Sequence, residues 1–188
     1  MFIIDKAVNK ELIIKKSKFI CLLFPINDTQ DAVNIIDDIK NEHKTATHVC
    51  YAYITKNNQK CFDDKEPSGT AGLPILELLK KKELTNILAI VIRYYGGIKL
   101  GAGGLIRAYS NSVKEAINFA TIKEYQEYIT VYLEGKLNDI KNLDNLTKNY
   151  IVKNKVITSN IKYQLLVPKT DKNNITSTFH KYKIKIED

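Results

Sequence analysis

The chain has 188 residues, 44% of them hydrophobic, and carries a formal net charge of +8 at pH 7. This length and hydrophobic content suffice for one large domain or two small ones with buried cores, and they exclude a disordered or fibrous chain. The basic balance favours anionic partners such as nucleic acid, phosphorylated metabolites or acidic lipid, although lysine-rich surfaces are also common on proteins without such partners.

The N-terminal residues and the cysteines both favour a soluble, cytoplasmic protein. The first residues, MFIIDKAVNK, interrupt their apolar run at Asp5 and Lys6 and so lack the apolar core of a signal peptide. The sequence has no run of roughly 18 apolar residues that could span a membrane. Cys21, Cys50 and Cys61 are odd in number and widely spaced, which indicates reduced core thiols and neither a disulfide framework nor a zinc site.

The first 120 residues alternate segments of strand and helix character. In chain order we expect strands at Glu11–Ile14 and Lys18–Phe24, a helix from Asp28 or Thr29 to about His43, a strand at Val49–Thr55, a short strand ending at Phe62, a helix carrying Ile75, Leu76 and Leu79, a strand at Ile87–Ile92, and a helix from about Gly104 to Ala120.

Hydrophobic periodicity predicts which faces of these elements are buried. The Ile87–Ile92 strand is apolar on both faces, as expected of a covered central strand. The first helix has an apolar stripe of Ala32, Val33, Ile36 and Ile39. The last helix has a buried stripe of Leu105, Ala108, Tyr109, Ser112, Ala116 and Ile117.

The character of the sequence changes after Ala120, where glycine nearly disappears. We therefore expect two domains, residues 1–120 and 121–188. The second contains six segments in the order strand, helix, strand, strand, helix, strand: Tyr125–Leu133, Leu137–Lys148, Tyr150–Ile157, Asn160–Val167, Asn174–Tyr182 and Lys183–Ile186. This β-α-β-β-α-β order predicts a ferredoxin-like domain, and the fold class is α+β.

A glycine-rich loop between a predicted strand and a predicted helix is the first candidate site. It contains the glycines Gly96, Gly97, Gly101, Gly103 and Gly104. Glycine permits positive φ and close approach of a ligand to the backbone, and unpaired N–H groups at a helix start stabilise phosphate. The alternative is a tight strand-to-helix connection without a ligand.

Basic residues around this loop favour phosphate or nucleic acid. The two arginines of the chain, Arg93 and Arg107, flank the loop and Lys99 lies inside it; arginine presents a planar fork that matches phosphate oxygens. Arg107, Asn111 and Lys114 share one polar helix face that could extend the contact. Tyr94, next to Arg93, adds an aromatic side chain that suits a polynucleotide.

An acidic loop forms a secondary candidate site. It contains Asp63, Asp64, Glu66 and Ser68, with His48 on a preceding strand. These residues could hold a divalent metal or supply an acid/base pair. We favour the alternative in which the carboxylates and the serine satisfy backbone donors in a turn and cap the next helix, so we expect no metal and no cofactor.

Both loops carry a resemblance to a known family. The stretches DDKEPSGTAGLP at residues 63–74 and RYYGGIKLGAGGLIRAY at residues 93–109 closely resemble the signature of the YigZ/IMPACT family. Lys65 stands where many relatives have glycine. The remainder of the chain resembles the ferredoxin-like C-terminal domain of bacterial members in length and pattern.

The resemblance implies a fold and a setting. The N-terminal domain is expected to share the fold of domain IV of elongation factor G, of a small-subunit ribosomal protein and of the GHMP kinases, and the C-terminal domain to be similar to domain V of that factor. Eukaryotic relatives are negative regulators of a kinase that controls translation initiation, and they act by binding its ribosome-associated activator.

Three functions follow from these patterns and stay open. The first is a non-catalytic regulator of translation that binds RNA or the ribosome through the basic glycine-rich surface. The second is a phosphate-handling enzyme, for phosphoryl transfer or phosphoester hydrolysis, that uses the glycine loop and the acidic loop. The third is a module that binds a protein partner in translation control. We expect no membrane partner.

Overall fold

The computed structural model describes residues 1–187, which form two compact units, Met1–Tyr125 and a second that begins at Gln126. Residues 121–125, which we expected in the second domain, lie in the first unit. The reason is that β7 (Ile122–Glu124) pairs antiparallel with β1 (Phe2–Ile4), with Ile3 opposite Lys123. Two short strands far apart in the sequence therefore close the first unit.

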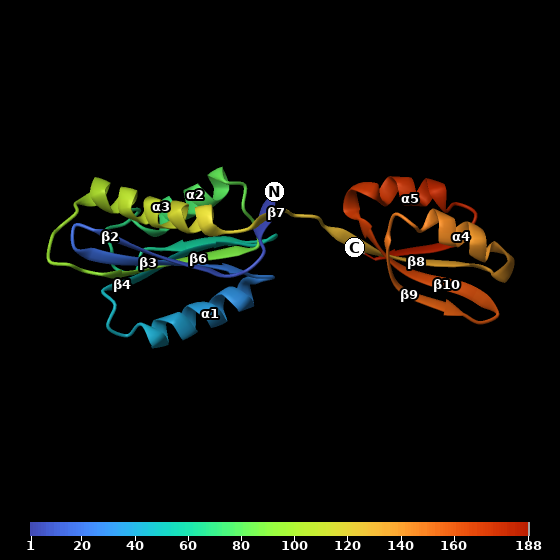
Figure 1. Ribbon diagram of the computed structural model, residues 1–188, viewed down its shortest axis with the longest axis horizontal. Helices are drawn as coiled ribbons and strands as arrows, with labels where there is room; N and C mark the ends of the chain where they lie inside the picture. Colours follow the sequence, from blue (N-terminus) through green and yellow to red (C-terminus); the bar gives the residue numbers. More distant parts are fainter. Residues whose placement is uncertain (188) are drawn as a thin grey trace. The chain divides into compact units, whose positions relative to one another are not determined.

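The first unit is a five-stranded antiparallel sheet covered by helices on both faces (Figure 1). Its strand order is β2 (Val8–Ile14), β3 (Ser17–Pro25), β6 (Ile87–Tyr94), β4 (His48–Ile54) and β5 (Gln59–Phe62). Helix α1 (Thr29–Glu42) packs on one face, and α2 (Gly72–Lys81) and α3 (Ala102–Phe119) pack on the other. Every predicted strand and helix of this part is present.

Strand β6 lies at the centre of the sheet and supplies both hydrophobic cores. Ile87, Ala89 and Val91 belong to the core beneath α2 and α3. Leu88 and its alternate neighbours belong to the core beneath α1. The prediction of a strand covered on both faces is confirmed, and the alternation fixes which face each later residue of β6 occupies.

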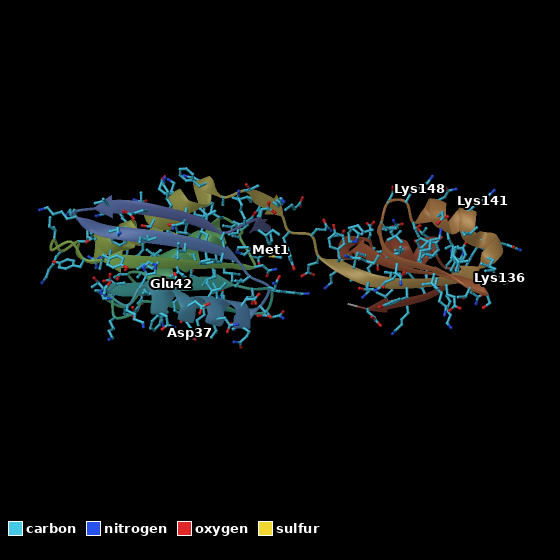
Figure 2. The ribbon with its side chains drawn as sticks, turned by 60° about the horizontal axis from the view of Figure 1, so that its bottom comes forward. Met1, Asp37, Glu42, Lys136, Lys141 and Lys148 are labelled. Atoms are coloured by element: carbon cyan, nitrogen blue, oxygen red, sulfur yellow. The ribbon has the colours of Figure 1, made fainter. Side chains whose placement is uncertain are left out.

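The helices bury most of the stripes that were predicted. In α3 the whole predicted stripe is buried, and in α1 Ala32, Ile36 and Ile39 are buried. Val33 was wrongly placed in the stripe, because its side chain lies beside the buried stripe and is 41% exposed. Figure 2 shows Asp37 and Glu42 on the outer side of α1, where both are exposed. The Asp28 carboxylate caps α1 by accepting the Asp31 N–H at 2.9 Å.

The second unit has the predicted β-α-β-β-α-β order of elements. These are β8 (Tyr128–Lys136), α4 (Ile140–Leu146), β9 (Ile151–Ile157), β10 (Asn160–Pro168), α5 (Lys172–Thr178) and β11 (Lys183–Glu187). The sheet is antiparallel in the order β11-β8-β10-β9. Helices α4 and α5 lie on one face of this sheet (Figure 1) and enclose a core that includes Leu143, Ile175 and Phe179.

No helix within residues 1–187 is long and apolar enough to cross a membrane.

Candidate functional site

The two predicted loops meet at one cavity in the first unit. This cavity has a volume of about 410 Å³ and lies between the acidic loop, residues 63–69, and the glycine loop, residues 96–104. Its lining includes His48, Glu66, Arg93 and Lys99, together with Gly101 and Ala102 at the start of α3. We call it the Arg93 cavity. Two segments that were considered separately in the sequence therefore form a single candidate site.

A buried ion pair forms the floor of the Arg93 cavity. Arg93 Nη1 lies 2.6 Å from Glu66 Oε1, and the two residues are only 5% and 7% exposed. The Tyr109 hydroxyl donates a hydrogen bond to the same Glu66 oxygen at 2.8 Å. Because Arg93 comes from β6, Glu66 from the acidic loop and Tyr109 from α3, this carboxylate joins three elements. A buried charge of this kind depends on its partners, since removing one leaves the other uncompensated.

The Arg93 guanidinium lies between two aromatic rings and retains an unused donor. Its Cζ is 5.5 Å from the ring centroids of both Phe19 and Tyr95, within the range of a cation–π contact. Within the described residues, the buried Nε of Arg93 has no hydrogen-bond partner. Buried polar groups are nearly always paired, so this N–H is an exception within the site.

Both ring nitrogens of His48 lie near residues of the acidic loop. Its Nδ1 is 2.6 Å from the Asp64 carbonyl oxygen, and its Nε2 is 3.8 Å from Glu66 Oε1. A carbonyl oxygen only accepts, so Nδ1 carries the proton and, in the neutral ring, Nε2 has a free lone pair. The histidine is thus oriented towards the carboxylate by the backbone of the acidic loop.

The other carboxylates of the acidic loop hold the backbone. Asp63 accepts the N–H groups of Gly69, Ala71 and Gly72 at 2.7–3.0 Å, and this fixes the entry into α2. Asp64 accepts the Val49 N–H at 2.7 Å. The prediction of turn and cap residues is confirmed for these two. It is wrong for Glu66, whose side chain turns inward to Arg93.

Two further points complete the acidic loop. Ser68 is exposed, and Asp63, not Ser68, supplies the side-chain oxygen at the start of α2. In the part of the chain that the structure describes, no group of three or more His, Cys, Asp or Glu side chains is arranged to hold a metal ion.

The glycine loop needs its glycines for different reasons. Gly97 and Gly101 have φ angles of +84° and +70°, in the region that favours glycine. A Cβ at Gly96 would lie 2.0 Å from the Lys16 carbonyl, so close packing against the β2–β3 turn requires glycine there. Gly103 has neither requirement, because among the described residues no atom beyond its chain neighbours and the nearby backbone of α3 lies within 4 Å of the position of its Cβ. A Cβ at Gly104 would lie 3.1 Å from Leu100 Cβ, so a larger residue there would be tightly packed.

The remaining predicted residues lie away from the Arg93 cavity. Tyr94 points to the opposite face of the sheet, where its hydroxyl is 2.8 Å from His43 Nδ1. Arg107, Asn111 and Lys114 are exposed on α3, as the predicted polar face requires, but they do not line the cavity. The structure thus brings Arg93, Lys99 and Gly101 together with His48 and Glu66 and separates them from the rest of the predicted basic surface.

Sequence reasoning missed two polar groups behind the cavity. Tyr109 was predicted as a core residue, yet its hydroxyl contacts Glu66, and burial raises its pKa. The Cys50 thiol lies 3.0 Å from the Asp63 carbonyl oxygen, and burial raises its pKa to about 12. A buried tyrosine hydroxyl generally requires a partner, and this rule is the signal that could have identified Tyr109.

Fold and site together define a two-unit α+β protein with a cavity lined by Arg93 and Lys99 at the start of α3. Residues 15–117 match the Impact N-terminal domain family. The chain is 39% identical over 177 residues to IMPACT family member YvyE of Bacillus subtilis, covering 92% of this chain and 82% of that protein. It is 41% identical over 113 residues to IMPACT family member YigZ of Escherichia coli, covering 57% of this chain and 55% of that protein. The chain therefore belongs to the IMPACT family, which confirms the resemblance seen in the sequence.

A solved structure is similar over both units. It is described as the crystal structure of an hypothetical protein, and it matches with a TM-score of 0.70 at 26% sequence identity. The match covers 99% of this chain and 95% of that one.

Proposed function

We propose that this protein is a non-catalytic regulator of translation that binds RNA, free or in the ribosome, through a phosphate contact at the Arg93 cavity. The observation that carries the proposal is the convergence of Lys99, Arg93 and the first turn of α3 on one cavity. We infer a setting in translation, and with it the cytoplasm, from the role that the resemblance implies for eukaryotic relatives, and membership of the IMPACT family supports this inference.

The charge balance of the cavity favours an anion. Glu66 compensates Arg93, which leaves Lys99 and the partial positive charge of the α3 N-terminus unmatched. Gly101, the residue before α3, has no side chain to cap the helix, so the first N–H groups remain available to a phosphate oxygen. Arg107, Asn111 and Lys114 form a separate exposed polar set on the same helix, which a longer RNA could also contact.

The arrangement of the domains supports the same setting. We infer that the first unit has the fold of domain IV of elongation factor G and that the second is a ferredoxin-like domain similar to domain V of that factor. The sheet order β11-β8-β10-β9 with both helices on one face is what a split β-α-β unit produces.

The proposal is tested by fluorescence anisotropy of the full chain with labelled oligouridylate and ribosomal RNA at several salt concentrations. We expect micromolar affinity that weakens steeply with salt, because each neutralised phosphate of a single strand adds about 0.7 to the log–log slope. Lys99→Ala should weaken binding and lower this slope by about 0.7, the value for one phosphate contact. Arg107→Ala tests whether the contact continues along α3.

The matched control is Lys60→Ala, an exposed lysine on β5 away from the cavity. It should leave the slope unchanged. Wild-type protein that does not bind RNA, or equal slopes for Lys99→Ala and Lys60→Ala, would contradict the proposal and favour binding of a protein partner by the same surface.

A phosphate-handling enzyme remains the second candidate, because His48 and Glu66 line the same cavity as Arg93 and Lys99. A phosphate held by Lys99 would face an imidazole with a free Nε2, which could accept a proton from an attacking water. Release of phosphate from nucleotide substrates that disappears in His48→Asn would support this function. If the wild type and His48→Asn both release phosphate only at the background rate, this function is excluded.

A further inference from the structure

The sheet of the second unit has one face that its helices leave open. Helices α4 and α5 cover the face formed by Ile129, Val131 and Leu133 of β8 and by their neighbours. Side chains alternate along a strand, so the residues between these point to the opposite face. Tyr128 and Tyr132 of β8 lie there and are 45% and 36% exposed. Among the described residues of this unit, no helix covers that face.

The strand register assembles two rows of mostly polar side chains across this open face. The first row is Lys185, Tyr132, Gln164 and Asn154, one from each strand. The second row is Lys183, Glu134, Lys162 and Val156. Tyr132 therefore lies at the centre of the sheet, with an amine on one side and two amides on the other.

A hollow beside Tyr132 is bordered by lysines. It has a volume of about 290 Å³ and is lined on the open face by Tyr132, Glu134, Lys162, Lys183 and Lys185. The three lysine side chains are 57%, 84% and 72% exposed. Lys162 and Lys183 share a single carboxylate, Glu134, at the long distances of 4.0 and 3.9 Å. Lys185 is hydrogen-bonded to a second carboxylate, Glu187, at 2.5 Å. The three amines thus have two carboxylate partners and keep an excess of one positive charge for another anion.

We propose that this open face is a second contact surface for single-stranded RNA, with a base stacked on Tyr132 and the backbone phosphates on Lys162, Lys183 and Lys185. The inference rests on the proposed function in taking RNA as the ligand, but it assigns a separate surface in the other unit. Gln164 and Asn154 present amide donors and acceptors next to the ring, as the edge of an unpaired base requires.

The chemistry of the face favours this occupant over an apolar one. A tyrosine on a central strand of a four-stranded sheet offers a flat ring to any base, and stacking tolerates any sequence. The surrounding amines match a polyanion, and the unit as a whole has eleven lysines against seven acidic residues. Of the apolar side chains of this face, Val156 and Ile151 lie on the edge strand β9 and Leu166 lies on β10, and none of the three lines the hollow.

The test is anisotropy of the full chain with labelled oligouridylate, using Tyr132→Ala and Tyr132→Phe. Loss of base stacking should weaken binding about 5-fold to 100-fold in Tyr132→Ala, whereas Tyr132→Phe keeps the ring and should bind like the wild type. Lys183→Gln and Lys185→Gln should each lower the salt slope by about 0.7. These lysine variants keep the test informative if Tyr132→Ala does not fold, because both side chains are exposed.

The outcomes separate this inference from the proposed function. If Lys99→Ala weakens RNA binding and none of the changes on the open face does, the function stands and this surface is excluded as an RNA contact. If Tyr132→Phe binds as weakly as Tyr132→Ala, the hydroxyl and not the ring is responsible, and stacking is refuted. Wild-type protein without RNA affinity refutes both.

Discussion

Removing the Glu66 carboxylate should destabilise the first unit more than any surface change of the same kind. In Glu66→Ala, Arg93 stays buried without a counter-charge and the Tyr109 hydroxyl loses its acceptor. Breaking a buried pair in this way costs about 3–5 kcal/mol. Glu66→Gln keeps an acceptor oxygen but no charge, so a smaller loss of about 1–3 kcal/mol is expected.

Hydrogen exchange of peptides from β6 measures this free energy for the first unit alone, since the central strand exchanges only when the unit opens. The matched control is Glu77→Ala. Glu77 is an exposed residue of α2 that pairs with Lys80, and such a pair contributes about 0–1 kcal/mol. If the β6 amides are protected from exchange equally well in the Glu66→Ala and Glu77→Ala variants, the buried network does not hold the unit together and the reasoning is wrong.

A double variant then separates charge from packing. Replacing both Glu66 and Arg93 with apolar residues removes the pair without leaving an unpaired charge, so part of the stability should return. If the double variant is less stable than Glu66→Ala by the full cost of Arg93→Met, the two side chains do not interact, contrary to their separation of 2.6 Å.

Three further predictions concern other parts of the chain. In a urea titration, Gly96→Ala should lower the free energy of unfolding by about 1–3 kcal/mol, because its Cβ would meet the Lys16 backbone. In the same titration Gly103→Ala should leave the free energy of unfolding unchanged or raise it by up to about 1 kcal/mol. The free energy of unfolding should fall as the pH rises above 9.0, because the unfolded state then releases the Cys50 proton, whereas the folded state, in which the pKa of Cys50 is about 12, retains it. Urea titrations at pH 8 and pH 10 should show a smaller decrease for Cys50→Ala than for the wild type. Residues 1–125 expressed alone should give a folded circular dichroism spectrum with cooperative melting, since the unit has its own cores, and an unfolded spectrum would show that the units depend on each other.

The elements of the fold could be predicted where a local pattern carries the information. The apolar run of β6 and the stripe of α3 identified both elements from periodicity alone. Strands β1 and β7 could not be predicted in this way, because each has only three residues and is stabilised by the other. For the same reason the first unit extends to Tyr125, beyond the expected boundary at residue 120.

The candidate site was only half visible in the sequence. The two loops were identified by their glycines and carboxylates, but the pairing of Glu66 with Arg93 joins residues of different loops and depends on tertiary packing. The period of two in β6 did contain a clue. Arg93 has the same parity as Ile87 and Val91, so it faces α2 and α3, whereas Tyr94 faces the other side.

The buried pair also sets how much positive charge the Arg93 cavity offers to an anion. Glu66 cancels the charge of Arg93, so the excess comes from Lys99 and about half a charge at the α3 N-terminus, about 1.5 positive charges together. A phosphodiester carries one negative charge and stays within this excess. A terminal phosphate carries about 1.5 to 2 negative charges at pH 7 and matches or slightly exceeds it. Charge balance therefore admits both an internal phosphate of an RNA chain and the terminal phosphate of a nucleotide, which is why the RNA-binding function and the phosphate-handling function both need the assays described above.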